Sequence, residues 1–207
     1  MVTGNPLLRR PRQGTLREAR ESFGLSEGRK TLAVVGGSQG AASLNRAVLE
    51  ALPAWSGRSD LQLVHAVGRD KFDEFMTQAE KMERGELVYR PMRFIERMDL
   101  VYGVADLVVC RAGASTIAEL AAAACPSILV PYPYATAAHQ DANAAVLCEE
   151  GAALLLEDRQ LSGSRLAREV DSLLADAGRL EAMREAARRV GRPDAAAALA
   201  GLVLSMA

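Results

Sequence analysis

The chain is poor in the residue types on which several classes of protein depend. Of its 207 residues only three are cysteine and 4% are aromatic, and the formal net charge is −1. A net charge near zero gives no electrostatic attraction for nucleic acid, and few aromatic side chains leave few surfaces on which bases could stack. We therefore expect no nucleic-acid partner.

Cysteine and long apolar runs are also scarce. Cys110, Cys125 and Cys148 show no metal-ligand spacing, so we expect no metal site and no cofactor. Three cysteines without a signal sequence indicate a reducing cytoplasm and buried, apolar roles for all three. The apolar tail at 195–207 is shorter than the roughly 20 residues that cross a bilayer. Any membrane contact is therefore expected to be peripheral.

The sequence does contain a regular alternation of apolar strands and helical patterns. Continuously apolar strands that are separated by helices predict a parallel sheet covered on both faces. We predict one doubly wound, Rossmann-like α/β domain over residues 15–207, preceded by a linker over residues 1–14. The expected strands are 31–35, 61–67, 87–89, 107–110, 127–130 and 153–156, and the expected helices are 41–51, 71–82, 98–104, 116–124, 140–149, 165–174, 180–189 and 195–203.

A glycine-rich turn follows the first expected strand. Gly36, Gly37 and Gly40 would let the backbone approach a ligand closely, and Ser38 could donate a hydrogen bond to a phosphate. The spacing is not the G-x-G-x-x-G dinucleotide fingerprint, which argues against an NAD-dependent dehydrogenase. A tight turn that only packs is the alternative interpretation.

The run from Cys110 to Glu119 is the most informative part of the chain. A strand ends, the chain turns through Gly113, and an alanine-rich helix begins with Ser115 and Thr116. The start of a helix attracts phosphate through its free N–H groups and its dipole. Glu119, about one turn further on, suits a ribose diol. The alternative is an ordinary helix start with serine as its cap.

Two further loops follow strands at the same edge of the expected sheet. In the loop at 131–143, His139 and Gln140 suit hydrogen bonds to sugar hydroxyls, or are exposed groups at a helix start. In the loop at 91–96, Phe94 and Ile95 offer an apolar wall for a base, or are core residues. His65, within an apolar strand, is expected to be a core histidine.

Together these motifs resemble the MurG family, the glycosyltransferases that add N-acetylglucosamine to lipid I to make lipid II in peptidoglycan synthesis. The resemblance extends over nearly the whole chain and depends on 36–41, 110–119, 131–134 and the His139-Gln140 pair. It implies the C-terminal, donor-binding half of a two-domain GT-B fold, with the N-terminal acceptor domain absent. It also implies a peripheral place at the cytoplasmic face of the bacterial cell membrane.

The resemblance also implies roles for individual residues. Ser38, Ser115 and Thr116 would hold the diphosphate of UDP-N-acetylglucosamine, and Glu119 would bind the ribose. The backbone of Ile95 would read the uracil edge, and His139 and Gln140 would hold the sugar hydroxyls. The reaction would be inverting and would need no metal, because the helix dipole and hydroxyl donors stabilise the departing UDP.

The resemblance leaves three hypotheses for the chain by itself. As a fragment of a MurG-type transferase, it would bind the donor and stabilise the leaving group but would not transfer sugar at a useful rate. It could instead be the donor-binding subunit of a split GT-B transferase, whose membrane-bound partner supplies the other half. It could also be a non-catalytic module that binds nucleotide sugars.

Overall fold

The computed structural model describes residues 5, 15–37, 39–82, 85–135, 139–192 and 194–205. Within these ranges the chain forms a six-stranded sheet in the order β3-β2-β1-β4-β5-β6, and every neighbouring pair is parallel. The strands are β1 (Lys30–Val35), β2 (Leu61–Ala66), β3 (Val88–Met92), β4 (Leu107–Cys110), β5 (Ser127–Leu129) and β6 (Ala153–Leu155). The predicted doubly wound parallel sheet is confirmed.

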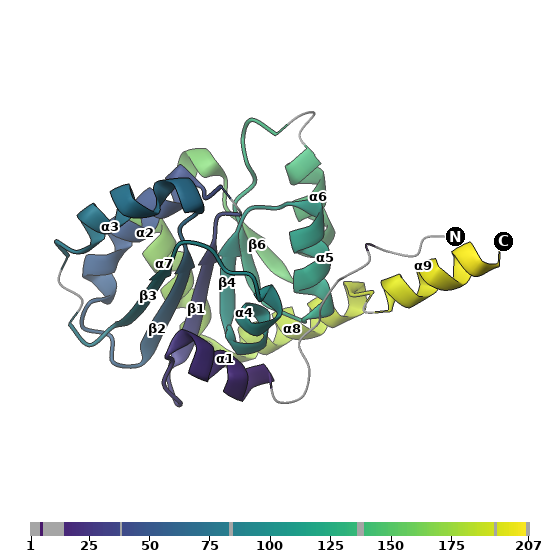
Figure 1. The fold of residues 1–207 in the computed structure, drawn as a ribbon, viewed down its shortest axis with the longest axis horizontal. Coiled ribbons are helices and arrows are strands. Elements are labelled where there is room, and N and C mark those ends of the chain that lie inside the picture. Colours follow the sequence, from purple (N-terminus) through teal and green to yellow (C-terminus); the bar gives the residue numbers. More distant parts are fainter. Residues whose placement is uncertain are drawn as a thin grey trace.

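Helices cover both faces of the sheet (Figure 1). One layer holds α2 (Ala42–Trp55), α3 (Phe72–Ala79) and α7 (Gly163–Ala175). The other holds α1 (Thr15–Phe23), α4 (Met98–Val104), α5 (Ala114–Ala122) and α6 (His139–Cys148). Two more helices, α8 (Ala177–Val190) and α9 (Ala195–Leu204), close the described chain, and α9 extends away from the sheet (Figure 1).

The central strands are mostly apolar because both of their faces are buried. Successive side chains of a strand point to opposite faces. Leu32 and Val34 accordingly pack in the core beneath α2, while Ala33 packs in the core on the other face. In α8, Leu180 belongs to the first core and Ala187 to the second, so this helix joins the two layers.

The structure differs from the sequence prediction at several element boundaries. Helix α1 was not expected, because its sequence is mostly polar and, over residues 16–23, only Ala19 and Phe23 are buried. Helix α2 continues to Trp55 rather than ending at 51, since its apolar face continues to this fully buried indole. Of the predicted 1–14 linker, only Asn5 is among the described residues.

The cysteine prediction holds for two of the three thiols. Cys110 and Cys125 are buried in the core, while Cys148 is only partly buried on α6. Burial raises the pKa of both core thiols, which keeps them protonated. They therefore behave as small apolar core residues.

Candidate functional site

A large cleft opens where β1 and β4 lie side by side. From β1 the chain continues to β2 and β3 on one side, and from β4 it continues to β5 and β6 on the other. Open α/β sheets bind ligands at such a switch point, outside the carboxyl ends of the strands. The cleft measures about 860 Å³ and is lined by residues that follow β1, β2, β4, β5 and β6.

The glycine turn after β1 forms one wall of this cleft. Gly36, Gly37 and Gly40 line it, whereas Ser38 lies outside the described residues. Gly40 has φ +74°, and a Cβ atom there would lie 2.0 Å from the carbonyl oxygen of Val67. The turn is therefore packed directly against the backbone that follows β2, and only glycine fits this contact.

The start of α5 forms the facing wall. Gly113 is the N-cap residue and supplies no side-chain cap, and the first helical bond runs from the N–H of Ile117 to its carbonyl. The N–H groups of the first helical turn have no partner within a helix, so this end presents donors and a positive dipole. Gly113 and Thr116 line the cleft, but the exposed Ser115 does not.

The position of Ser115 corrects one sequence interpretation. Helix α5 begins at Ala114, two residues before the predicted start at 116. Ser115 therefore lies inside the first turn and cannot be the cap. A glycine with ordinary extended angles (φ −68°, ψ 146°) holds the N-cap position instead.

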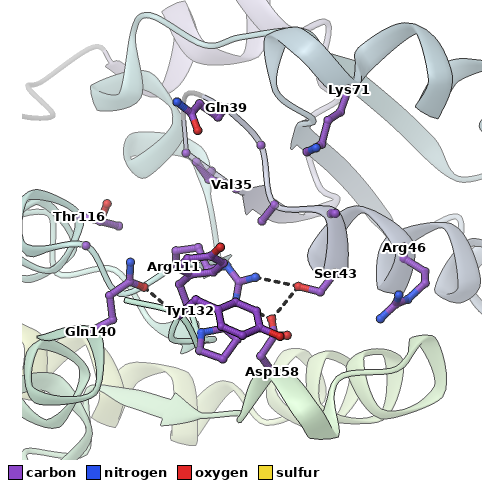
Figure 2. A pocket seen from close by; sticks show the side chains of 18 of the residues that line it. Val35, Gln39, Ser43, Arg46, Lys71, Arg111, Thr116, Tyr132, Gln140 and Asp158 are labelled. Carbon is purple, nitrogen blue, oxygen red and sulfur yellow. Dashed lines mark hydrogen bonds and ion pairs between the residues drawn. The ribbon is translucent and has the colours of Figure 1, made fainter. Parts of the chain in front are cut away.

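Gln140, at the start of α6, joins two of the cleft loops. Its Oε1 accepts a hydrogen bond from the N–H of Tyr132 at 2.9 Å (Figure 2). The same oxygen accepts a second hydrogen bond from the N–H of Ala112 at 3.2 Å. Because the oxygen is engaged within the protein, the Nε2 group is the end that a ligand can use. His139, the first residue of α6, is exposed and does not line the cleft.

Glu119 and Ile95 lie away from the lining of this cleft. The hydroxyl of Tyr102, on α4, donates a hydrogen bond to Oε2 of Glu119 at 2.8 Å. Burial and the nearby carboxylate raise the pKa of Tyr102 far above its usual range, so the phenol stays a donor. The side chain of Ile95 is 6% exposed and packs in the core, so it forms no wall of this cleft.

A partly buried polar cluster that lines the cleft was missed from the sequence. Nη1 of Arg111 lies 2.6 Å from Oδ1 of Asp158, and Nη2 donates to Oγ of Ser43 at 2.7 Å (Figure 2). Ser43 in turn donates to Oδ1 of Asp158 at 2.6 Å. These residues are up to 115 positions apart, so no local sequence pattern connects them. The one available signal was the position of Arg111 directly after an apolar strand, at the edge where ligands bind.

His65 is a core histidine, as expected. Its Nε2 lies 3.1 Å from Oδ1 of Asn45, and its Nδ1 lies 2.9 Å from the hydroxyl of Tyr89. Since Nδ2 of Asn45 donates to the carbonyl of Val67, Oδ1 is the acceptor and Nε2 carries the proton. Complete burial lowers the pKa of His65 to about 3, which keeps the ring neutral.

Metal-binding clusters and membrane-spanning helices are both absent from the part of the chain that the structure describes. No group of three His, Cys, Asp or Glu residues is placed to hold a metal ion there. Within the same residues, no helix has the length and apolar character that crossing a membrane requires.

The model of the glycosyltransferase family 28 C-terminal domain matches residues 31–199. The UDP-N-acetylglucosamine–N-acetylmuramyl-(pentapeptide) pyrophosphoryl-undecaprenol N-acetylglucosamine transferase of Halothermothrix orenii is 36% identical over 98% of this chain and 55% of its own length. The protein of that name from Listeria monocytogenes serotype 4a is 40% identical over 100% of this chain and 56% of its own length. The chain thus spans about half the length of the curated relatives it matches.

Solved structures of other proteins share the fold of this chain. The structure of Acinetobacter baumannii MurG superposes with a TM-score of 0.75 at 28% identity, over 90% of this chain and 53% of that one. The C-terminal CMP-Kdo binding domain of WaaA from the same organism shares the fold, with a TM-score of 0.64 at 17% identity over 86% of this chain and 98% of that one. The resemblance to the MurG family is confirmed, and the chain belongs to the glycosyltransferase family 28 C-terminal domain family.

Proposed function

We propose that this chain is the donor-binding half of a transferase that moves N-acetylglucosamine from UDP-N-acetylglucosamine to lipid I, in peptidoglycan synthesis at the cytoplasmic face of the membrane. One observation carries the proposal. The uncapped start of α5 and the glycine turn after β1 face each other across a cleft of about 860 Å³ at the β1–β4 switch point. Backbone donors on both walls suit a diphosphate.

The diphosphate would lie between Gly36–Gly40 and Gly113–Thr116. Backbone N–H groups and the helix dipole would stabilise the negative charge that develops on UDP as the sugar departs. Such fixed donors would act without a metal ion. The glycines matter because side chains at Gly36 and Gly40 would collide with neighbouring backbone, at 2.4 Å and 2.0 Å respectively.

The two ends of the donor would then lie on opposite sides of the diphosphate. The nucleoside would extend toward α4, where Glu119 would accept from the ribose hydroxyls and the backbone of Ile95 would meet the uracil edge. The sugar would extend toward α6, where Nε2 of Gln140 would donate to a hydroxyl and His139 would add a second contact. Because Oε1 of Gln140 already accepts two hydrogen bonds within the protein, Nε2 is the end of the amide that would face the sugar.

Lipid I would be the acceptor, and its attack on the anomeric carbon would be inverting. None of the residues assigned to the donor is proposed as the base that activates the acceptor hydroxyl. The curated relatives are about twice as long as this chain. We assign acceptor binding and the peripheral membrane contact to the half of such proteins that this chain does not match.

Titration calorimetry tests the donor assignment directly. The chain is titrated with UDP-N-acetylglucosamine, and UDP-glucose, ADP and NAD serve as competitors. We expect uridine nucleotides to bind and ADP and NAD to bind weakly or not at all. Binding of ADP or NAD in preference to UDP would contradict the proposal.

A further inference from the structure

Arg111 stands at the meeting point of four cleft loops. It follows β4 directly and contacts the first turn of α2 through Ser43, the end of β5 through the carbonyls of Val130 and Pro131, and the turn after β6 through Asp158. The distances from its Nη atoms to these acceptors are 2.6–3.1 Å. Such a fork of donors is available to arginine and not to lysine.

We infer that Arg111 is a positioning residue of the donor site: held by Asp158, it fixes the cleft loops relative to one another and so sets the affinity for the donor diphosphate, without acting as its counter-ion. This inference rests on the proposed function. It assigns the cluster of Arg111, Asp158 and Ser43 a role that differs from attracting the negative charge of the donor.

The charge of Arg111 is already balanced within the protein. Its side chain is 13% exposed and that of Asp158 is 19% exposed, at an N–O distance of 2.6 Å. A close, largely buried pair of opposite charges is nearly neutral when seen from the cleft. Lys71 and Arg46 also line the cleft, on the side away from Thr116 and Gln140 (Figure 2). Arg46 lies 3.9 Å from a carboxylate oxygen of Glu50, so Lys71 is the cation better placed to attract an anion.

The contacts of Arg111 lead to the groups that are proposed to touch the donor. The carbonyls of Val130 and Pro131 lie just before Tyr132, whose N–H donates to Gln140. The guanidinium group also lies 5.4 Å from the ring of Tyr132. On the other side, Ser43 lies in the first turn of α2, which begins at Ala42, two residues after Gly40. Losing the fork would therefore loosen both walls of the cleft.

The test compares Arg111→Lys and Asp158→Asn with the wild type. Arg111→Lys keeps the positive charge but cannot reach all four partners, so we expect its affinity for UDP-N-acetylglucosamine to fall about tenfold or more. Arg90→Lys is the matched control. Arg90 lies on β3, does not line the cleft, and likewise donates to two backbone carbonyls, those of Phe23 and Gly24. Urea unfolding of each variant checks that the fold is kept.

Salt dependence separates positioning from direct ion pairing. Affinities are measured at about 50 mM and about 300 mM salt, between which exposed charges become strongly screened. We expect the affinity ratio of wild type to the double variant Arg111→Gln/Asp158→Asn, which removes both charges of the pair, to be the same at both salts. A variant that binds like the wild type, or a ratio that shrinks at high salt, overturns the inference.

Amide hydrogen exchange supplies a readout that needs no ligand. We expect faster exchange in Arg111→Lys at Tyr132 and Ala112, with the core strands β1 and β2 unchanged. Unchanged exchange at these two amides, or a uniform rise across the chain, overturns the positioning role. If the wild type binds no uridine nucleotide, the proposed function fails and so does the affinity part of this inference, whereas exchange still decides whether Arg111 holds the loops.

Discussion

The hydroxyl of Tyr102 donates a hydrogen bond to Oε2 of Glu119 over 2.8 Å, and so links α4 to α5. The bond occupies one oxygen of the carboxylate and fixes its orientation, which leaves Oε1 for another donor. Because the phenol is nearly buried, its own proton has no competing partner in water. Glu119 is thus oriented in advance for the ribose contact that we propose.

Removing the Glu119 carboxylate is expected to weaken binding strongly. A hydrogen bond to a charged group contributes roughly 1.5–3 kcal/mol, so Glu119→Ala should lower the affinity for UDP about ten- to a hundredfold. Tyr102→Phe should cost less, about two- to tenfold, because the carboxylate remains but loses its orientation. Calorimetry with UDP measures both effects. Glu185→Ala, an exposed carboxylate on α8, is the control and should bind like the wild type.

Gly40→Ala is expected to destabilise the chain and to abolish donor binding. The left-handed backbone at φ +74° alone costs an alanine about 1–2 kcal/mol. The 2.0 Å approach to the carbonyl of Val67 adds to this cost and displaces the turn. Urea unfolding gives the loss of stability. Gly37→Ala, with φ +83° and no atom within 4 Å, should show only the backbone cost, and unaltered stability of Gly40→Ala would contradict the packing described for the turn.

His65 should make the stability fall in mild acid. The folded chain holds the ring neutral with a pKa of about 3, whereas the unfolded chain takes up a proton near pH 6.5. The unfolded state therefore binds more protons between these values, and this stability is present above pH 6.5 and lost as the pH falls toward 3. From pH 7 to pH 5 the wild type should lose about 2 kcal/mol more than His65→Gln.

Urea unfolding at the two pH values checks this prediction. His139→Gln is the control, because His139 is exposed at the start of α6 and its replacement should leave the pH dependence of the wild type unchanged. Equal pH dependence in the wild type and His65→Gln would show that the buried histidine does not remain neutral.

Lys71 should contribute to donor affinity in a salt-dependent way. It lines the cleft at the start of α3, and no carboxylate among the described residues lies within ion-pair distance of it. Lys71→Ala is expected to lower the affinity for UDP about two- to fivefold at low salt and less at high salt, since exposed charges are screened. Lys81→Ala, just beyond the opposite end of α3, should have no effect. Calorimetry at two salt concentrations distinguishes these outcomes.

Most of the fold could be predicted because the buried strands leave a plain signal. The runs at 32–35 and 107–110 are apolar at every position, which is typical of a sheet covered on both faces. Helix α1 was missed because it buries only a narrow stripe that includes Ala19 and Phe23, and short polar helices depend on tertiary packing. Boundaries such as Trp55 depend on contacts across the core that no local pattern records.

The site could be predicted where backbone geometry determines it and not where distant side chains meet. The glycines follow one apolar strand, β1, and the start of α5 follows another, β4. Each pattern by itself indicates a loop at the carboxyl edge of a parallel sheet. The pairing of Arg111 with Asp158 depends on two loops 47 residues apart, and nothing near either residue indicates the other. The internal use of Oε1 in Gln140 likewise appears only once the two loops lie together.

Amide chemical shifts in a titration of the ¹⁵N-labelled chain with UDP test the central claim most directly. The donor assignment predicts that the amides of Gly36, Gly37 and Gly40 and of Ala114–Thr116 move together, at the same UDP concentrations, while those of α9 stay fixed. The same amides should barely respond to uridine without phosphates. Binding of UDP with no change at either wall of the cleft, or with changes confined to another face, would contradict a diphosphate site between β1 and β4.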